Sequence, residues 1–221
     1  DDAIFHNYDL SDNLYIKFFL SNKIEYLMKM SAGVIAGNQY ILQYAQNAGA
    51  KKVLKMPTVI DIDKYATNAP NIKIKDRFTV GWIGSPSTTK YLEIVKESLS
   101  KLGLEVPILL YLVGADSNYD LSIDNVKIVS VPWSELNEQE ALKIFDVGIM
   151  PLYDNPWEKG KCAFKLIQYM ASFLPVIASN VGMNSEIISN YENGFIVKNS
   201  GDWYDCFYKI YSHPPIKIEM G

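Results

Sequence analysis

The chain contains little cysteine, histidine or arginine. Its 221 residues include two cysteines (Cys162 and Cys206), two histidines (His6 and His213) and one arginine, Arg77. The cysteines are far apart in the sequence and lack metal-ligand spacing, so we expect two reduced thiols of a cytosolic protein. With so few histidines, neither a zinc site nor a Ser–His–Asp triad has enough parts nearby.

Long hydrophobic runs are also missing. No apolar run approaches the roughly 18 residues of a membrane span, and no signal peptide opens the chain. The net charge of −4 excludes a broad basic surface, so we expect no nucleic-acid partner. Because Arg77 is the one arginine among 21 basic residues, any anion site must use lysines and backbone amides. The chain begins with Asp1 and ends without a closing signal, so we expect a piece of a longer protein.

What the sequence does contain is, first, a set of helical signals. Residues 14–30 have mixed helical spacing, and Asn38 can cap a helix over 39–47. A short helix is expected over 138–145, and the tryptophans, Trp133 among them, are expected in the core or at its rim. The helix expected over 88–102 has four apolar residues on one face, Leu92, Val95, Leu99 and Leu102.

The sequence also contains an alternation of short apolar runs with helical segments. After a polar linker at 61–75, six expected strands cover 78–84, 108–113, 126–131, 147–150, 175–178 and 194–197. This order predicts parallel βαβ units, hence an α/β fold with a Rossmann-like, doubly wound parallel sheet of six strands flanked by helices. We therefore expect two domains, residues 1–70 and residues 71–221. Ligands of such sheets bind outside the carboxyl ends of the strands.

One helix, expected over residues 161–173, carries the strongest functional signal. One side of it carries Lys161, Lys165, Gln168 and Ser172. The opposite side carries Ala163, Leu166, Ile167, Met170 and Leu174. Free amides at a helix N-terminus, together with lysines in the first turns, suit a diphosphate, and Gln168 could bind a sugar hydroxyl. The alternative is a solvated polar face on a helix that packs on the core.

The turn at residues 84–90 is a second candidate for phosphate binding. Gly84, Ser85 and the following hydroxyl groups can surround a phosphate, and Lys90 lies in the first turn of the next helix. The turn matches neither G-x-G-x-x-G nor a Walker loop, which argues against a dinucleotide-dependent dehydrogenase. The alternative is that this segment only caps a helix, at Ser87.

Four motifs resemble those of family 4 glycosyltransferases, which have the two-domain GT-B fold. They are Gly81–Thr88, Phe145–Leu152, Lys161–Ser179 and Gly182–Val197. The first is similar to the opening of the family's C-terminal domain, and the second to its fDigimPL strand. The third is similar to K-L-x-E-x-M-A-x-G-x-P-V-V-A-S, and the fourth to the G-x-x-E-x-x-x-x-x-x-N-G-F ending. Residues 32–65 resemble the end of the N-terminal domain, with its crossover formed by Pro57, Asp61 and Tyr65.

The resemblance implies transfer of a sugar from a nucleotide-diphosphate donor with retention at the anomeric carbon. It implies that Lys90 and either Lys165 or Lys161 face the diphosphate, and that Gln168 lies at the ribose. We expect no metal and no other cofactor. The segment 61–63 looks like the D-x-D metal motif of the other glycosyltransferase fold, but it lies in the crossover and is discounted.

Several residues depart from the family's pattern. Gln168 stands where the family has the second glutamate of E-x7-E, and Gly160 where it has the first. Glu158, two residues away, is therefore the candidate catalytic residue for the donor hexose. Ser85 replaces an arginine, and Phe173 replaces a glycine. We place the chain in a divergent branch in which lysines take the phosphate role.

The leading hypothesis is the donor-binding part of a cytosolic, retaining hexosyltransferase in bacterial surface polysaccharide assembly, such as capsule or lipopolysaccharide. The expected partners are a nucleotide-sugar donor and a saccharide or lipid-linked acceptor. A lipid-linked acceptor would be compatible with peripheral association of the protein at the inner face of the membrane. Such a fragment need not be active alone. Two alternatives stay open: a nucleotide-sugar 2-epimerase of similar fold, and a non-catalytic nucleotide-sugar-binding domain.

Overall fold

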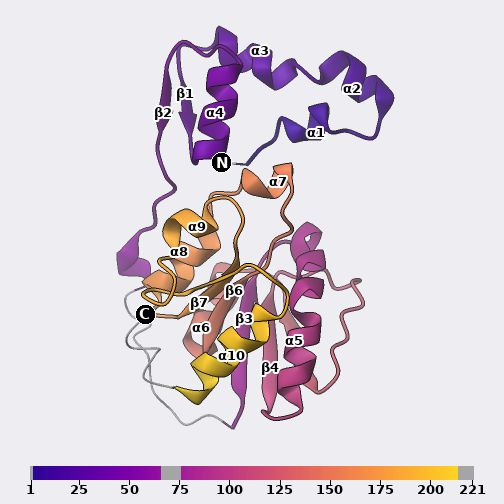
Figure 1. The fold of residues 1–221 in the computed structure, drawn as a ribbon, viewed down its shortest axis with the longest axis vertical. Helices are drawn as coiled ribbons and strands as arrows, with labels where there is room; N and C mark the ends of the chain where they lie inside the picture. Colours follow the sequence, from indigo (N-terminus) through magenta and orange to yellow (C-terminus); the bar gives the residue numbers. More distant parts are fainter. Residues whose placement is uncertain (1, 66–75, 214–221) are drawn as a thin grey trace. The chain divides into compact units, whose positions relative to one another are not determined.

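The computed structural model describes residues 2–65 and 76–213, which form two compact units (Figure 1). The first unit is built from the described residues up to Val59, together with Asp154–Phe164 and Val181–Glu186. The second unit contains the described parts of Ile60–Tyr153, Lys165–Asn180 and Ile187–Gly221. The predicted domain boundary at residue 70 lies outside the described residues.

The first unit contains short helices and a small parallel sheet. Its elements are α1 (His6–Asp9), α2 (Leu14–Leu20), α3 (Lys23–Met30), β1 (Val34–Ala36), α4 (Gln39–Asn47), β2 (Val53–Lys55), α7 (Pro156–Lys159) and most of α9 (Asn184–Ile187). Strands β1 and β2 are parallel, with Val34 opposite Val53. The expected helical stretch 14–30 is interrupted at residues 21–22, where α2 ends and α3 begins.

Aromatic contacts hold the start of the chain against α4. The Phe5 ring is fully buried and stacks on Tyr44, with ring centroids 3.6 Å apart. The His6 ring bonds the Asp9 carboxylate through Nδ1 at 2.8 Å and the Tyr40 hydroxyl through Nε2 at 2.7 Å. Burial and the nearby Asp9 charge raise the pKa of Tyr40 above its ordinary value. The N-terminal segment is thus part of the unit's packing.

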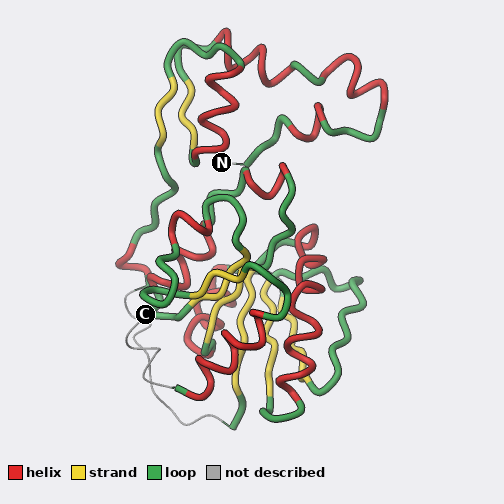
Figure 2. Tube along the Cα trace, viewed as in Figure 1, coloured by secondary structure: helices red, strands yellow, loops and turns green. Residues whose placement is uncertain are grey.

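The second unit is a six-stranded parallel sheet with helices, shown by secondary structure in Figure 2. Its strands are β3 (Phe78–Ile83), β4 (Ile108–Val113), β5 (Val126–Val131), β6 (Val147–Met150), β7 (Val176–Ser179) and β8 (Phe195–Val197). Its helices are η1 (Ile62–Lys64), η3 (Pro86–Leu92), α5 (Glu93–Gly103), α6 (Glu135–Ile144), α8 (Phe164–Ala171, all but its first residue) and α10 (Asp202–Ser212). The strand order is β5-β4-β3-β6-β7-β8, and every neighbouring pair is parallel. The predicted fold class is confirmed.

The main core lies between one face of this sheet and helices α5 and α10, which lie together in Figure 1. The apolar face predicted for the helix after β3 is confirmed, because its four members are fully buried: Leu92, Val95, Leu99 and Leu102. From α10, Trp203 and Phe207 complete this core. Burial of each large apolar side chain contributes about 1.5–3 kcal/mol, so this layer dominates the stability of the unit.

The opposite face of the sheet carries helix α8 on a close contact. A Cβ atom on Gly148 of β6 would lie 2.4 Å from the Tyr169 ring, so only glycine lets the ring approach the strand. The Tyr169 hydroxyl, fully buried, accepts a hydrogen bond from the backbone N–H of Ile83 at 2.9 Å. Burial raises the pKa of Tyr169 well above its ordinary value, which keeps the phenol neutral. Tyr169 therefore joins α8 to the end of β3.

The limits of α8 differ from the prediction. The helix begins at Phe164 rather than at Lys161, because Ala163 has a φ of 55° and α-helical residues require a negative φ. The helix ends at Ala171, and two residues further on Phe173 is left-handed, with a φ of 57°. This is the position where the family's pattern has glycine, the residue that adopts this conformation at least cost.

We expect Tyr169→Phe to lower the free energy of unfolding by about 1–3 kcal/mol, because it leaves the buried Ile83 N–H without a partner. Urea denaturation followed by circular dichroism measures this change. Tyr208→Phe is the matched control, because the half-exposed Tyr208 hydroxyl makes no hydrogen bond among the described residues. The control should change stability by less than about 0.5 kcal/mol. Equal effects of the two variants would show that the buried hydrogen bond contributes nothing.

Candidate functional site

The loops after β3, β4 and β5 begin side by side at the carboxyl edge of the sheet. The Gly84 N–H donates to the Val113 carbonyl at 2.9 Å, and the Gly114 N–H donates to the Val131 carbonyl at 2.9 Å. The buried Thr89 hydroxyl accepts from the Asp116 N–H at 2.8 Å, which ties the second of these loops to the first. The sheet thus brings together the loops in which ligands of parallel sheets bind.

The turn after β3 is tightly constrained. A Cβ atom on Gly84 would lie 2.0 Å from the Trp82 ring, so glycine is required there. The Ser85 N–H donates to the Thr88 hydroxyl oxygen at 3.1 Å, and that hydroxyl donates to the Ser85 carbonyl at 2.8 Å. Ser85, not Ser87, is therefore the helix cap. Because Thr88 already takes up the Ser85 N–H, this amide is less available to a phosphate than the sequence suggests.

Lys90 lies in η3 and is exposed to solvent. Its Nζ lies 5.7 Å from the centroid of the neighbouring Tyr91 ring, a weak cation–π contact that leaves the ammonium group free to meet an anion. Lys165 lies in the first turn of α8 and is half-buried. The second unit thus holds four predicted diphosphate residues, which are Gly84, Ser85, Lys90 and Lys165.

Gln168 is buried rather than solvated. Only 2% of its surface is exposed, and Ser172 on the same side of α8 is 1% exposed. The interpretation of this side as a merely solvated face is therefore wrong for both residues. The Gln168 Nε2 donates to Glu138 Oε1 at 2.7 Å and to the Tyr65 hydroxyl at 3.1 Å. Glu138 comes from α6 and Tyr65 from the residue after η1.

Glu138 has a second partner in the loop after β5. Its Oε2 accepts a hydrogen bond from Trp133 Nε1 at 2.9 Å. The sequence marked neither residue as functional, since Glu138 was only the expected start of a helix and Trp133 was expected in the core or at its rim. The available signal was their order: an aromatic residue shortly after an expected strand, then a carboxylate in the first turn of the next helix.

The two remaining predicted residues, Glu158 and Lys161, belong to the first unit. Glu158 is 3% exposed and lies in α7, where the Asn155 side chain accepts its backbone N–H at 3.3 Å. Lys161 follows α7 and is half-buried, and its backbone N–H donates to the Glu158 carbonyl at 3.0 Å. Lys161 is outside α8, so it does not share a helical face with Lys165 and Gln168.

Asn38 fixes the segment that carries Lys161. Its Oδ1 accepts the Ile41 N–H at 2.8 Å, which confirms the predicted cap of α4. Its Nδ2 lies 2.8 Å from the Gly160 carbonyl and 3.2 Å from the Lys161 carbonyl. This fully engaged amide, 1% exposed, was predicted only as a cap.

The D-x-D-like segment has a local role. Asp61 accepts the Asp63 N–H at 3.3 Å and caps η1. Within residues 2–65 and 76–213, no group of three or more histidine, cysteine or acidic side chains could hold a metal ion.

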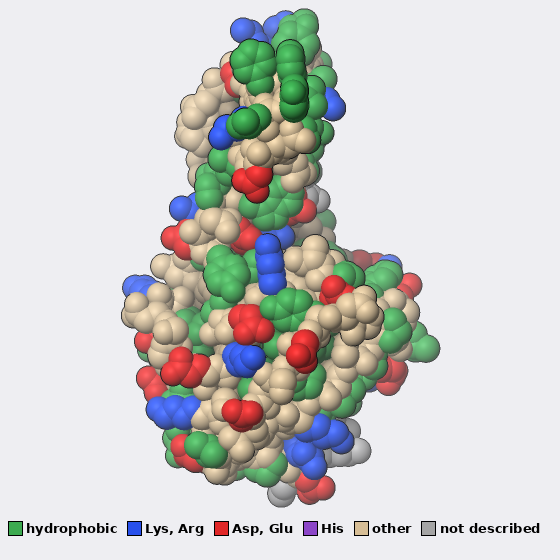
Figure 3. Space-filling model, turned by 90° about the vertical axis from the view of Figure 1, so that its right-hand side faces the viewer, with side chains coloured by type: hydrophobic (Ala, Val, Ile, Leu, Met, Phe, Trp, Pro, Cys, Tyr) green, Lys and Arg blue, Asp and Glu red, His purple; other side chains and the backbone are tan. Residues whose placement is uncertain are grey.

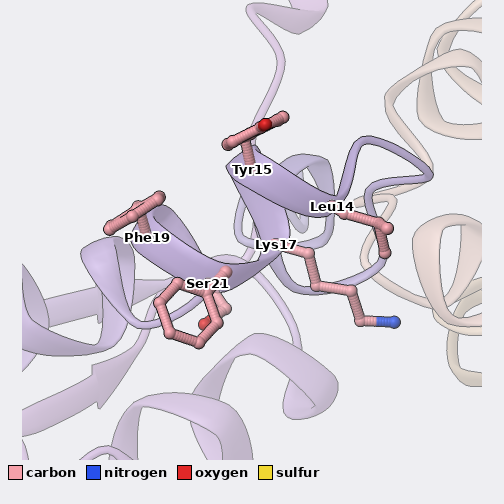
Figure 4. A pocket seen from close by; sticks show the side chains of 6 residues that line it. Leu14, Tyr15, Lys17, Phe19 and Ser21 are labelled. Carbon is pink, nitrogen blue, oxygen red and sulfur yellow. The ribbon is translucent and has the colours of Figure 1, made fainter.

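A hollow of about 650 Å³ lies on the first unit, and none of the predicted site residues lines it (Figure 4). It is lined by Leu14, Tyr15, Lys17, Phe18, Phe19 and Ser21.

None of the helices in the described parts of the chain has the length and apolarity needed to cross a membrane. On the face shown in Figure 3, basic and acidic side chains are interspersed over the surface.

Comparisons with known structures agree with the observed fold. Sucrose-phosphate synthase from Thermosynechococcus elongatus superimposes with a TM-score of 0.73 at 15% identity, covering 100% of this chain and 59% of that chain. HepE of Anabaena, solved in complex with UDP and glucose, gives a TM-score of 0.68 at 15% identity, covering 90% of this chain and 59% of that one. These similarities establish a GT-B glycosyltransferase fold.

The sequence itself identifies the family. The family model described as "Glycosyl transferases group 1" matches residues 77–213, more than half of the chain, and the protein belongs to this family. TuaH of Bacillus subtilis (strain 168), whose name assigns it to teichuronic acid biosynthesis as a glycosyltransferase, is 24% identical over 156 residues. That match covers 65% of this chain and 38% of TuaH. With 59% coverage of sucrose-phosphate synthase as well, the chain spans less than two thirds of the length of either protein.

We expect Asn38→Asp to loosen the 159–161 segment, because aspartate can still cap α4 but turns a carboxylate toward backbone carbonyl oxygens. The expected loss of stability is about 1–3 kcal/mol, measured by urea denaturation. Limited trypsin digestion should cleave faster after Lys159 and Lys161.

Asn13→Asp is the matched control for this variant. Asn13 caps α2 in the same way but is exposed and bonds only backbone N–H groups there. A carboxylate at that helix N-terminus should be neutral or slightly stabilising. If both variants behave alike, the Asn38 contacts to the 159–161 segment are not significant.

Proposed function

We propose that this chain supplies the donor-binding part of a retaining hexosyltransferase that uses a nucleotide-diphosphate sugar. The proposal is supported by family membership over 77–213 and by one structural observation. That observation is the carboxyl edge of the parallel sheet, where the Gly84–Ser85 turn, Lys90 and the first turn of α8 with Lys165 follow from adjacent strands. UDP is bound by HepE, which supports a nucleotide donor here without fixing its base.

The chemistry of transfer explains why cations are wanted at this edge. When the bond from the sugar to the diphosphate breaks, negative charge grows on the departing phosphate oxygens. Ammonium groups of Lys90 and Lys165 would stabilise that charge more strongly in the transition state than in the bound donor. Lys161 is proposed as a further cation and Glu158 as the carboxylate for the donor hexose. No metal or other cofactor is part of this proposal.

The biological setting is a further part of the proposal. We propose that the complete protein acts in the cytoplasm on a saccharide or lipid-linked acceptor, in bacterial surface polysaccharide synthesis. TuaH carries a name of that class, which supports this setting. Acceptors of this kind would bring the protein to the inner face of the membrane.

A non-catalytic nucleotide-sugar-binding domain is the second candidate. It is favoured by Gln168, which stands in place of a glutamate of the family's pattern. A panel of nucleotide sugars in a thermal-shift assay, followed by turnover measurements with and without acceptor, distinguishes the two. Binding with no turnover by the complete protein would support the second candidate. Turnover without any acceptor, as sugar epimerisation, would contradict both.

We expect Lys165→Ala to weaken binding of a nucleoside diphosphate by about 1.5–3 kcal/mol, the usual range for hydrogen bonds to charged groups. Isothermal titration calorimetry measures this loss. Lys127→Ala is the control, because Lys127 is exposed near the amino end of β5, at the opposite edge of the sheet. Unchanged affinity for Lys165→Ala would remove this lysine from the diphosphate site.

A further inference from the structure

Glu138 joins the loop just before α6 to helix α8, which lies 30 residues further along the chain. Glu138 as a whole residue is 8% exposed, and it lies in the first turn of α6, where backbone N–H groups favour negative charge. One oxygen accepts from Trp133 in the loop after β5, and the other from Gln168 on α8. Gln168 in turn donates to Tyr65. A buried carboxylate with two donors on its two oxygens is a well-satisfied arrangement.

The chemistry of these partners fixes the orientation of the Gln168 amide. A carboxylate only accepts hydrogen bonds, so the amide must turn its NH₂ group toward Glu138. That nitrogen has two hydrogens, and the two contacts at 2.7 Å and 3.1 Å use both of them. The amide carbonyl oxygen is therefore the one polar atom of this side chain that these contacts do not use, and it makes no hydrogen bond to the described residues. Toward a ligand, Gln168 offers an acceptor only.

Trp133 combines an anchored edge with an open ring. Its indole N–H is held by Glu138, while 60% of the residue is exposed to solvent. A large aromatic ring whose orientation is fixed but whose surface is free is suited to stacking on a planar ligand. Because the same carboxylate holds both residues, the ring and the Gln168 carbonyl are kept in a fixed relation.

We propose that Glu138 is the positioning residue of a nucleoside-recognition element, in which the Trp133 ring stacks on the base and the Gln168 carbonyl accepts from a ribose hydroxyl. This rests on the proposed function. The ribose contact of Gln168 is the one that the family resemblance implies, whereas the positioning role of Glu138 and the Trp133 platform are added here. The contact with Glu138 also explains why residue 168 is a glutamine. A glutamate there would place two carboxylates in contact, and one of them would have to hold a proton.

The first test is Glu138→Gln. A glutamine at 138 has one oxygen and one NH₂ group, so it cannot accept from both Trp133 and Gln168. With its oxygen on Trp133, its NH₂ group would force the Gln168 amide to flip and turn N–H groups toward the ribose. The effect on ligand affinity is measured by titration calorimetry. The ligands are uridine, guanosine and adenosine diphosphate, the 2′-deoxy form of whichever of these binds most tightly, and inorganic pyrophosphate.

We expect Glu138→Gln to weaken the best nucleoside diphosphate about tenfold, the effect of losing one to two hydrogen bonds. The preference for ribose over 2′-deoxyribose should fall toward one, while pyrophosphate affinity stays within about twofold, because the lysines are unchanged. A merely structural role would weaken all of these ligands together. A circular dichroism melt of each variant monitors folding.

The ring is tested separately by Trp133→Leu. Removing a stacking platform should weaken nucleoside diphosphates about tenfold and leave pyrophosphate unaffected. Tyr208→Leu is the matched control, a half-exposed aromatic residue on α10. Unchanged nucleoside diphosphate binding by Trp133→Leu would exclude the base platform.

The exchange variant Glu138→Gln with Gln168→Glu keeps the test decisive if a single variant folds poorly. Its glutamine can accept from Trp133 and donate to the new carboxylate, so an acceptor again faces the ribose. We expect the exchange variant to have the melting temperature and the ribose preference of the unmodified chain. Gln168→Glu alone should have neither.

Two failures are distinguishable. If the unmodified chain binds neither pyrophosphate nor any nucleoside diphosphate, the proposed function fails and this inference fails with it. If it binds them but Glu138→Gln and the exchange variant keep the ribose preference of the unmodified chain, only the role of Glu138 is overturned.

Discussion

Parallel pairing of β3 with β4 and β6 is the constraint on which the rest of this structure depends. In a parallel sheet every strand ends at the same edge, so loops that are far apart in the sequence begin next to one another. Here that edge collects the Gly84–Ser85 turn, the loop with Gly114, and the loop with Trp133. Without this pairing, the candidate residues would have no common location.

Helix α8 shows how packing and recognition share the same residues. Tyr169 uses its hydroxyl to hold the end of β3, and its ring requires glycine at 148. The neighbouring Gln168 turns toward α6 and meets Glu138. A side of the helix that looks polar in sequence is therefore buried at Gln168 and Ser172, and the Gln168 NH₂ group finds specific partners there. These partners matter for stability, because a buried polar group left without a hydrogen bond costs about 1–3 kcal/mol.

The sheet could be predicted because its central strands are apolar on both faces, with β3 and β6 entirely buried. The start of α8 could not, because the left-handed backbone at Ala163 follows from its packing and not from any sequence preference. Likewise, the cap at Ser85 instead of Ser87 depends on the Thr88 hydroxyl turning back onto Ser85. Local conformations of this kind are set by contacts that a linear pattern does not contain.

The sequence by itself determined the fold class, the strand positions, the Asn38 cap and the resemblance to the glycosyltransferase family, because periodicity and motif order are properties of the chain. Only the tertiary structure decided which polar groups meet. It paired Glu138 with Trp133, 5 positions away, and with Gln168, 30 positions away, and it gave Asn38 a second set of contacts on the 159–161 segment. Hydrogen bonds act over about 3 Å, so they depend on distances in space that sequence spacing does not specify.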